Sequence, residues 1–475
     1  MLKSGLVTLL LLIGMNSFSQ TFSAQPEEFL KQMNKYLGSI NRTKTKPFIE
    51  EFSPVWLNEF PAEYRSKVVA TSNLIVSKGL PAFPDLHGYL LSTYSFVKTN
   101  QPKESFNSWH ATIDKLLNSK KVKKFQVFIE TCSGFFTDGT IFSSTKHIWG
   151  VRGGTYRFVF EKNNPKIYFD DATFYCYVYN KDKIKKNKNP FIDSTVIRTT
   201  NGEYQPLVYK WNGMGGIVDW AKVGLNPKAN YATITNYILS LKSTKVQCDS
   251  VEVHTDYYEK PLQGSFVDIA SANKSGEYPQ FISFSKKIIK KSILPEIDYV
   301  GGFALNGESF TGVGYDNELA SLLFYKDGKT FLKASAMRFS INAKGIVSND
   351  CGVNMFISET DSIFHPGLNL RYDNKKVELT RSSEGLAQAP FSDSYHQLDL
   401  YVEKIIWTKS DPNLNFTWGV GSNKTAKFES KNYFDERLYT ELQGMSDLHP
   451  LVAIYKHYYK FDESTYSIAQ ASSLE

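Results

Sequence analysis

The stretch that decides the fold lies between Gly301 and Arg381, and part of it reads AMRFSINAKGIVSNDCGVNMFISET from Ala336 to Thr360. Apolar residues recur there at every second position. They form three sets: Met337, Phe339 and Ile341; Cys351, Val353, Met355 and Ile357; and Leu368, Leu370 and Tyr372. A period of two places each set on one face of a β-strand. This stretch therefore predicts successive strands with one buried face.

Turn residues separate these strands. Asp327-Gly328 is the strongest signal, because a tight hairpin turn needs positive φ at both central residues. A glycine-rich run opens the stretch, with Gly301, Gly302 and Gly307 followed by Gly312 and Gly314. Asp-Ser also recurs, at 193–194, 249–250 and 361–362, where both side chains can bond backbone amides as a strand begins. These signals favour antiparallel hairpins.

Strand-like patterns continue on both sides of the central stretch. They are predicted at residues 125–129, 156–160, 166–169, 174–179, 231–241 and 251–254, and again at 398–407 and 413–420. We divide them into a β-rich domain over 124–298 and a second, with hairpin rungs, over 299–432. Stacked sheets, a jelly roll and a solenoid-like array all remain open.

The two ends of the mature chain show helical periodicity instead. Residues 25–118 carry about five amphipathic segments, the first with apolar residues at Phe29, Met33, Tyr36 and Ile40. A further helical segment is predicted over 433–475, and we interpret it as the start of a further domain that the sequence truncates. The expected class is α+β: an N-terminal all-α domain, a long antiparallel β region and a helical C-terminal segment.

Residues 1–19 have the pattern of a secretory signal peptide. Lys3 supplies a basic start, an apolar run follows, and Ser17 and Ser19 fit the small-residue positions before a cleavage site. No later stretch is long and apolar enough for a transmembrane helix. We expect an exported protein, periplasmic or associated with the outer envelope.

Composition describes a folded chain. Of 475 residues, 41% are hydrophobic and 22% charged, and the formal net charge is +7. A high aromatic share of 15% suits pleated, half-buried surfaces. Lysine clusters at 181–188 and 286–291 lack the aromatic signature of an RNA-binding sheet, so a nucleic-acid partner is not expected.

Four cysteines, at Cys132, Cys176, Cys248 and Cys351, allow three disulfide pairings if the protein is exported. Each lies in a strand-like context, where an unpaired thiol would also pack as a small apolar residue. Closely spaced Cys or His pairs are missing from the sequence, so no metal site and no cofactor are predicted.

One polar cluster follows the central stretch. It contains Asp361, His365, Asp393, His396 and Glu403. A Ser/His/Asp set for acyl transfer can be assembled from it with neighbouring serines, and Asp393 with Glu403 would form a carboxylate pair for glycoside cleavage. No nucleophile-elbow motif accompanies these residues. Ordinary turn chemistry explains every member, so the cluster is a weak catalytic candidate.

Four tryptophans are weak candidates for a sugar-binding platform: Trp211, Trp220, Trp407 and Trp418. Buried aromatic cores explain most such residues equally well.

Three segments carry a resemblance to a known family. They are residues 298–303 (DYVGGF), 361–368 (DSIFHPGL) and 389–396 (APFSDSYH). In these segments the chain resembles the N-terminal portion of large, signal-bearing, uncharacterised envelope proteins of Gram-negative bacteria. The resemblance implies a helical part before a long β-rich region, and it assigns no catalytic residues. In strand pattern alone the chain is also similar to the β-jelly-roll modules of lipopolysaccharide transport.

The sequence therefore favours an exported envelope binding or scaffold protein without catalytic activity. Its β-sheet surface or groove would serve a lipid, glycan or protein partner. The alternative is a glycan- or ester-directed hydrolase that uses the cluster at 361–403.

Overall fold

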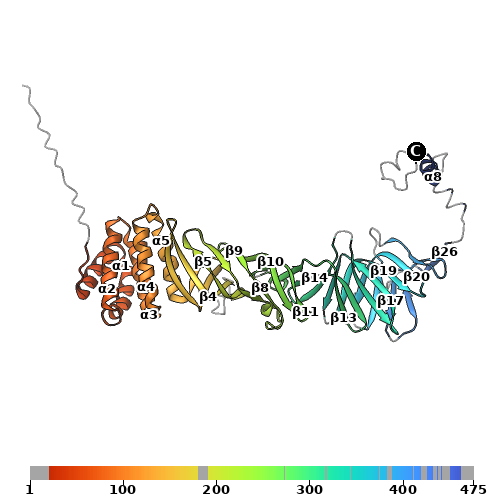
Figure 1. Cartoon of the computed structure of the whole chain (residues 1–475), viewed down its shortest axis with the longest axis horizontal. Coiled ribbons are helices and arrows are strands. Elements are labelled where there is room, and N and C mark those ends of the chain that lie inside the picture. The colour runs from red at the N-terminus through yellow and green to blue at the C-terminus, as the bar shows by residue number, and fades with distance from the viewer. Residues whose placement is uncertain are drawn as a thin grey trace, which may run out of the picture. The chain divides into compact units, whose positions relative to one another are not determined.

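The computed structural model describes residues 21–179, 191–271, 273–315, 318–342, 344–373, 375–381, 388–409, 411–418, 425–431, 436, 440 and 450–461. Helices come first in the chain and antiparallel strands follow, as Figure 1 shows. The predicted α+β class is confirmed. The predicted signal peptide at 1–19 and most of the segment 433–475 lie outside the described residues.

Five helices form the N-terminal part: α1 (Pro26–Asn58), α2 (Ala62–Ser77), α3 (His87–Lys98), α4 (Lys103–Leu117) and α5 (Phe125–Asp138). Helix α8 (Pro450–Phe461) lies within the predicted C-terminal helical segment. The described helices include none that is long and apolar enough to cross a lipid bilayer.

Helix α1 contains the first two helical segments that the sequence predicts. Its backbone leaves the helical region at Asn41, where φ is −150° and ψ is 83°. The Asn41 side chain accepts a hydrogen bond from the Lys44 N–H at 3.1 Å, so it caps the second half of the element. Phe29 stacks on Trp56 across the break, and Phe52 stacks on Trp56 within the second half, which gives the two halves a shared aromatic core.

The strand predicted at 125–129 is wrong, because these residues open helix α5. Phe125, Phe128, Ile129 and Cys132 are all buried, and their spacing follows the helical period rather than the period of two. Gly139, with φ of +81°, ends the helix at a left-handed position. The helical part therefore reaches twenty residues beyond the predicted end at 118.

The strands of the first half are β1 (Thr140–Ser143), β2 (His147–Arg152), β3 (Thr155–Glu161), β4 (Asn164–Tyr179), β5 (Phe191–Gln205), β6 (Lys210–Met214), β7 (Ile217–Asp219), β8 (Tyr231–Ile234), β9 (Asn236–Ser240), β10 (Lys245–Thr255), β11 (Tyr258–Ile269), β12 (Gln280–Ser283), β13 (Ile288–Leu294), β14 (Ile297–Asn306) and β15 (Ser309–Val313).

The strands of the second half are β16 (Ala320–Lys326), β17 (Lys329–Ala336), β18 (Arg338–Asn342), β19 (Gly345–Phe356), β20 (Ser362–Tyr372), β21 (Lys376–Thr380), β22 (Phe391–Asp393), β23 (Leu398–Tyr401), β24 (Lys404–Thr408), β25 (Leu414–Thr417) and β26 (Lys427–Ser430). The pairs described between these strands are antiparallel, for example β16 with β17 and β19 with β20.

Long, irregular hairpins recur along the β region: β4–β5, β10–β11 and β19–β20. Their pairing register shifts within the strand, and Asp171 and Asp350 hold positive φ near two of these shifts. Such bulges bend a strand and increase its twist. Strand β4 therefore contains both segments predicted separately at 166–169 and 174–179. The second Asp-Ser pair lies at a register shift inside β10 rather than at the start of a strand.

The described chain divides into two compact units. The first runs through Lys286 and also contains Gly302–Thr311, and the second comprises Lys287–Gly301 and the chain from Gly312 onward. Within the first unit, the helical part and the first strands share a core. Phe135 of α5 packs edge-on against Phe169 of β4, and the Ser105 hydroxyl of α4 bonds the Tyr156 carbonyl of β3.

Two of the clustered glycines in the second unit give room to one aromatic ring. A Cβ at Gly301 or at Gly312 would overlap the Tyr299 side chain. The Tyr299 hydroxyl accepts a hydrogen bond from the Val313 N–H at 2.9 Å. Close packing on Tyr299 therefore explains why glycine stands at both positions.

All four cysteines are buried and free. Cys176, Cys248 and Cys351 lie on β4, β10 and β19, whereas Cys132 lies on helix α5 and not in a strand. Burial raises the pKa of each thiol, to about 12 for Cys248 and Cys351. They pack as small apolar side chains.

Candidate functional site

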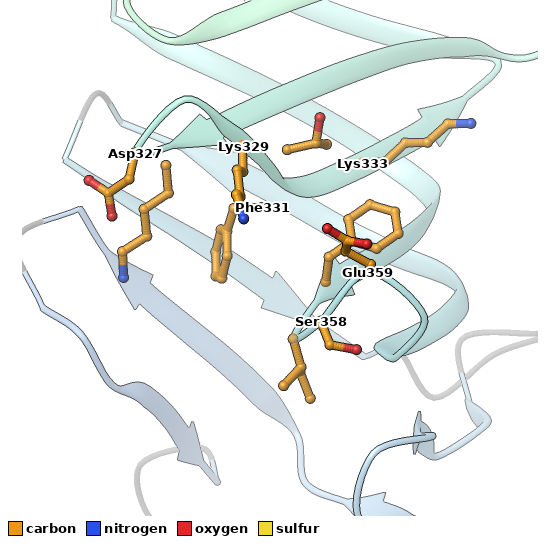
Figure 2. Close-up of a pocket in the computed structure, with 10 residues that line it drawn as sticks. Asp327, Lys329, Phe331, Lys333, Ser358 and Glu359 are labelled. Atoms are coloured by element: carbon orange, nitrogen blue, oxygen red, sulfur yellow. The ribbon is translucent and has the colours of Figure 1, made fainter.

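A large hollow lies in the second unit, between the β16–β17 hairpin and the turn after β19. Its volume is about 860 Å³. Figure 2 shows Asp327 and Phe331 on the hairpin side, and Ser358 and Glu359 on the turn. Small-molecule sites in proteins commonly occupy a few hundred to about 1,000 Å³. The hollow is open to solvent and large enough for such a ligand.

The hairpin on one side follows directly from the sequence. Asp327 and Gly328 connect β16 to β17 with φ of 53° and 76°, which is the predicted turn with positive φ at both positions. Beyond it, Leu332 and Ala334 of β17 are buried. Their neighbours Phe331 and Lys333 point to the other face by the alternation of a strand, and both line the hollow.

Aromatic side chains give the hollow an apolar floor. Phe331 on β17 packs against the buried Trp407 of β24, with ring centroids 4.6 Å apart. Phe356 at the end of β19 also lines the hollow and is half-buried, and Ile357 beside it is exposed. An apolar group placed here would cover Phe331, Phe356 and Ile357 together and remove their surfaces from water.

Charged residues of both signs surround this floor, and the lysines outnumber the carboxylates by one. The Lys326 ammonium lies 5.7 Å from the centre of the Phe331 ring, within the range of a cation–π contact. Lys329 and Lys333 are exposed, and among the described residues neither forms an ion pair. Asp327 and Glu359 are the two acidic residues of the lining. The lining therefore contains three lysines and two carboxylates, which gives it a formal net charge of +1.

Asp361, one of the sequence candidates, shapes the turn that borders this hollow. Its Oδ2 accepts hydrogen bonds from the Ser358 and Thr360 hydroxyls, both at 3.1 Å. Its Oδ1 accepts one from the Ser394 hydroxyl at 3.0 Å. Hydrogen bonds from Ser394, Thr360 and Ser358 lower the pKa of Asp361. The carboxylate therefore fixes the turn and ties it to the loop after β22.

Asp393 and His396 meet in the loop after β22. The His396 Nδ1 lies 2.8 Å from Oδ2 of the buried Asp393, whose Oδ1 accepts hydrogen bonds from the Tyr395 and His396 N–H groups. A serine protease pairs such a histidine with a nucleophilic hydroxyl. Here the adjacent Ser394 hydroxyl donates to Asp361 instead. The hydrogen bonds of Asp393 therefore stabilise the turn after β22.

His365 has a different position, in the interior of the second unit. Its Nε2 donates to the Ala389 carbonyl at 2.9 Å, and its Nδ1 accepts from the Gly367 N–H at 3.2 Å. Both ring nitrogens are therefore occupied in the neutral form. Burial lowers the pKa of His365, which keeps that form at neutral pH.

Glu403 lies at the far end of the β22–β23 hairpin from Asp393. Leu398 is the register partner of Asp393, and Glu403 lies five residues further along the chain. Glu403 lies in the bend between β23, which ends at Tyr401, and β24, which begins at Lys404. Its N–H donates to the Thr417 carbonyl and its carbonyl accepts from the Arg381 N–H, so its backbone is fixed by residues other than those that hold Asp393.

The tryptophan candidates are mostly core residues. Trp211 and Trp220 are completely buried, Trp407 is buried beneath Phe331, and Trp418 is half-buried. Trp211 stacks on Phe174 inside the first unit, and the Trp220 Nε1–H donates to the Pro279 carbonyl. Three of the four are therefore not exposed for stacking with a sugar.

The sequence analysis predicted no binding site at the residues that line the hollow. The signal that indicates them is the alternation Lys329, Phe331, Lys333, in which two lysines flank an aromatic residue on one strand face. The turn at Asp327-Gly328 was predicted from its local sequence. The turn at Ser358 lies opposite it because β17 pairs with β19, and local sequence does not show this pairing.

Among the described residues, no group of three or more His, Cys, Asp or Glu side chains is arranged to hold a metal ion. Comparisons with protein-family models, with curated proteins and with solved structures find no match to this chain.

Proposed function

We propose that this chain is an exported envelope protein without catalytic activity, and that it binds a small amphipathic molecule with an anionic group in the hollow beside the β16–β17 hairpin. One observation carries the proposal: an 860 Å³ hollow combines an aromatic floor with lysines that form no ion pair among the described residues. The apolar part of the ligand would cover Phe331 and Phe356, and its anionic group would face Lys329 and Lys333.

Physical chemistry favours this class of ligand over a neutral sugar. Lysine is a flexible point charge that suits a phosphate or carboxylate group. Lys326 over Phe331 shows that a cation and an apolar ring already share this surface. The alternative of a hydrolase has less support, because His365 is fully hydrogen-bonded in the interior and Ser394 is bound to Asp361.

Location in the envelope rests on the sequence. The pattern at residues 1–19 supports export, and the resemblance to large envelope proteins of Gram-negative bacteria supports the periplasm or outer envelope. In that compartment, both lipids and lipid-linked glycans are sources of anionic amphiphiles. A scaffold role toward a protein partner is compatible with the same sheet surface.

Isothermal titration calorimetry with two probes tests the binding site. Dodecyl phosphate and dodecyl maltoside share a tail, and each is used below its micelle concentration. We expect dodecyl phosphate to bind, and Lys329→Ala/Lys333→Ala to weaken its binding about tenfold, since two charge-assisted contacts are lost. Phe331→Ala should weaken binding of both probes.

The matched control is Lys260→Ala, which removes an exposed lysine in the first unit and should leave binding unchanged. Equal affinity for both probes, or equal loss in the control and the double variant, would contradict a lysine-lined anion site. Hydrolysis of an ester or glycan that His396→Ala abolishes would contradict the non-catalytic role.

A further inference from the structure

Three charged side chains lie together in the first unit, and the two carboxylates among them are buried. Lys222 comes from the single turn η4 (Ala221–Val223), Asp268 from β11 and Asp193 from β5. The Lys222 Nζ lies 2.6 Å from Oδ1 of Asp268 and 3.7 Å from Oδ1 of Asp193. The side chains of Asp268 and Asp193 are only 5% and 4% exposed.

Backbone groups orient the lysine in this cluster. Its Nζ donates to the carbonyls of Ser194 and Ile269, each at 3.2 Å. These two bonds hold the nitrogen beside the carboxyl group of Asp268, whose Oδ1 lies 2.6 Å away.

The carboxyl group of Asp268 is close to the nitrogen but poorly solvated. Its Oδ1 has no hydrogen bond of acceptable geometry among the described residues, although the Lys222 Nζ is 2.6 Å away. Burial raises the pKa of Asp268, against the lowering effect of the Lys222 charge. Burial therefore makes Asp268 easier to protonate than a solvated carboxyl group, and a neutral carboxylic acid is a far better electrophile than a carboxylate.

The surroundings of the cluster are apolar. Phe266 lies two residues before Asp268 on the buried face of β11, and its ring packs edge-on against Trp220, two residues before Lys222. Cys176 is completely buried, and burial raises the pKa of its thiol, with the charges of Asp268 and Asp193 as further causes. An ammonium and two carboxylates are costly to keep ionised in such a place.

We propose that Lys222 and Asp268 condense to an intramolecular isopeptide bond, with Asp193 as the proton carrier. The motivating geometry is an amine held against a buried carboxyl group, with a second carboxyl group beside both. Proximity of this kind replaces a bimolecular encounter with a step inside the fold.

The reaction balances without an oxidant or a cofactor. The Lys222 ammonium gives one proton to Asp193, which passes it to the carboxylate of Asp268, so that a neutral amine faces a neutral carboxylic acid. The Nζ lone pair then attacks Cγ of Asp268 and the N–Cγ bond forms. Asp193 takes one proton from the attacking nitrogen and gives it to the leaving hydroxyl, so the Cγ–OH bond breaks, water leaves and Asp193 is ionised again. One ammonium and one carboxylate become one amide and one water.

The same chain contains a matched ion pair that should not react. Lys166 Nζ lies 2.7 Å from Oε2 of Glu203, nearly the same distance. Although burial raises the pKa of Glu203, hydrogen bonds from Lys166, Gln205, Asn212 and Tyr168 lower it to about 2. Glu203 therefore stays ionised and resists attack.

The experiment is a tryptic digest of the purified full chain, unfolded before digestion and analysed by mass spectrometry. Trypsin cuts after a free lysine, so an amide at Lys222 leaves residues 211–228 uncut. We expect this peptide linked to residues 246–274, at the sum of both masses minus one water. The peptides that contain Lys166 and Glu203 should appear unlinked in the same digest.

Two variants assign the roles. Lys222→Arg keeps a cation but cannot form this bond, so its digest gives the unlinked standard. Asp193→Asn keeps both reacting groups, and it should give the unlinked peptides in a protein whose circular dichroism matches the parent. Recovery of the parent peptides separately, with a cut after Lys222, would overturn the proposal. A complete link in Asp193→Asn would overturn the role of Asp193.

Discussion

Two lysine–carboxylate pairs of the first unit have nearly equal distances and opposite electrostatics. Lys166 with Glu203 measures 2.7 Å, and Lys222 with Asp268 measures 2.6 Å. The two lysine side chains are 14% and 13% exposed, so they hardly differ. The carboxyl groups do differ, because the pKa of Glu203 is lowered and that of Asp268 is raised.

The number of hydrogen-bond donors around the acid explains the difference. Glu203 accepts from the side chains of Tyr168, Gln205 and Asn212 in addition to Lys166. Asp268 is shielded from water by burial, and its Oδ1 accepts no hydrogen bond of acceptable geometry from the described residues. The distance of an ion pair therefore does not tell which protonation state a protein favours. The donors that replace water decide it.

Replacement of Lys222 should give the largest effect, because it removes the partner of Asp268 both as an ion pair and as an amide. In Lys222→Met, Asp193 and Asp268 face each other in the interior without a counter-charge. We expect a loss of about 3–5 kcal/mol in the free energy of unfolding, because a buried charge is left uncompensated. Urea denaturation measures it, with Lys228→Met as an exposed control. A loss no larger than that of the control would contradict the importance of this cluster.

Replacement of both partners should restore part of that loss. Lys222→Met/Asp268→Leu fills the site with apolar side chains, while Asp193 keeps its bonds to the Ser194 and Ser271 N–H groups. We expect the double variant to be more stable than Lys222→Met by about 2 kcal/mol. The same denaturation series measures it. Equal stability of the two variants would show that Asp268 is not the penalised group.

The pair of Lys166 and Glu203 should tolerate the same substitution. Lys166→Met leaves Glu203 with its three neutral donors, so we expect a loss of at most about 1 kcal/mol. The comparison with Lys222→Met in one denaturation series is the measurement. A loss as large as that of Lys222→Met would mean that the donor count does not separate the two sites.

The smallest and most specific effect is expected in how the stability of the fold depends on pH under acidic conditions. The pKa of Glu203 in the folded chain, about 2, lies below the usual value of about 4.3 in an unfolded chain. Its contribution to stability is therefore present above that usual value and is lost as the pH falls toward 2. Glu203→Gln should remove this slope between about pH 4.5 and 2.

Asp268 has the opposite sign in the same pH scan. A carboxyl group with a raised pKa contributes stability that is present at low pH and is lost as the pH rises through its folded value. An amide at Asp268 does not titrate, so the linked chain should lack this slope. Thermal denaturation across the pH range measures the effects of Glu203 and of Asp268. If the parent chain and Glu203→Gln gave identical curves, the predicted contribution of Glu203 would be contradicted.

Much of the fold could be predicted because the spacing of apolar residues along the chain distinguishes a helix from a strand. The apolar spacing of Phe29, Met33 and Ile40 predicted α1, and the turn Asp327-Gly328 predicted the β16–β17 hairpin. The strand expected at Phe125–Ile129 failed because a run of five residues fits both periods. Only the continuation to Cys132 and Phe136 separates them.

The sites were harder to predict because distant segments build them. Asp361 and Asp393 were recognised as polar residues at strand ends, but their partners determine that they serve turns. Asp268 did carry a signal, since it interrupts the buried face of β11 between Phe266 and Ala270. The proximity of Lys222 and Asp193 to it depends on the packing of three separate elements.

The four buried thiols have a consequence for how the chain responds to a reductant. Each is unpaired and lies in its own element, with a raised pKa that keeps the reactive thiolate scarce. The described fold therefore contains no disulfide among these four residues that a reductant could break.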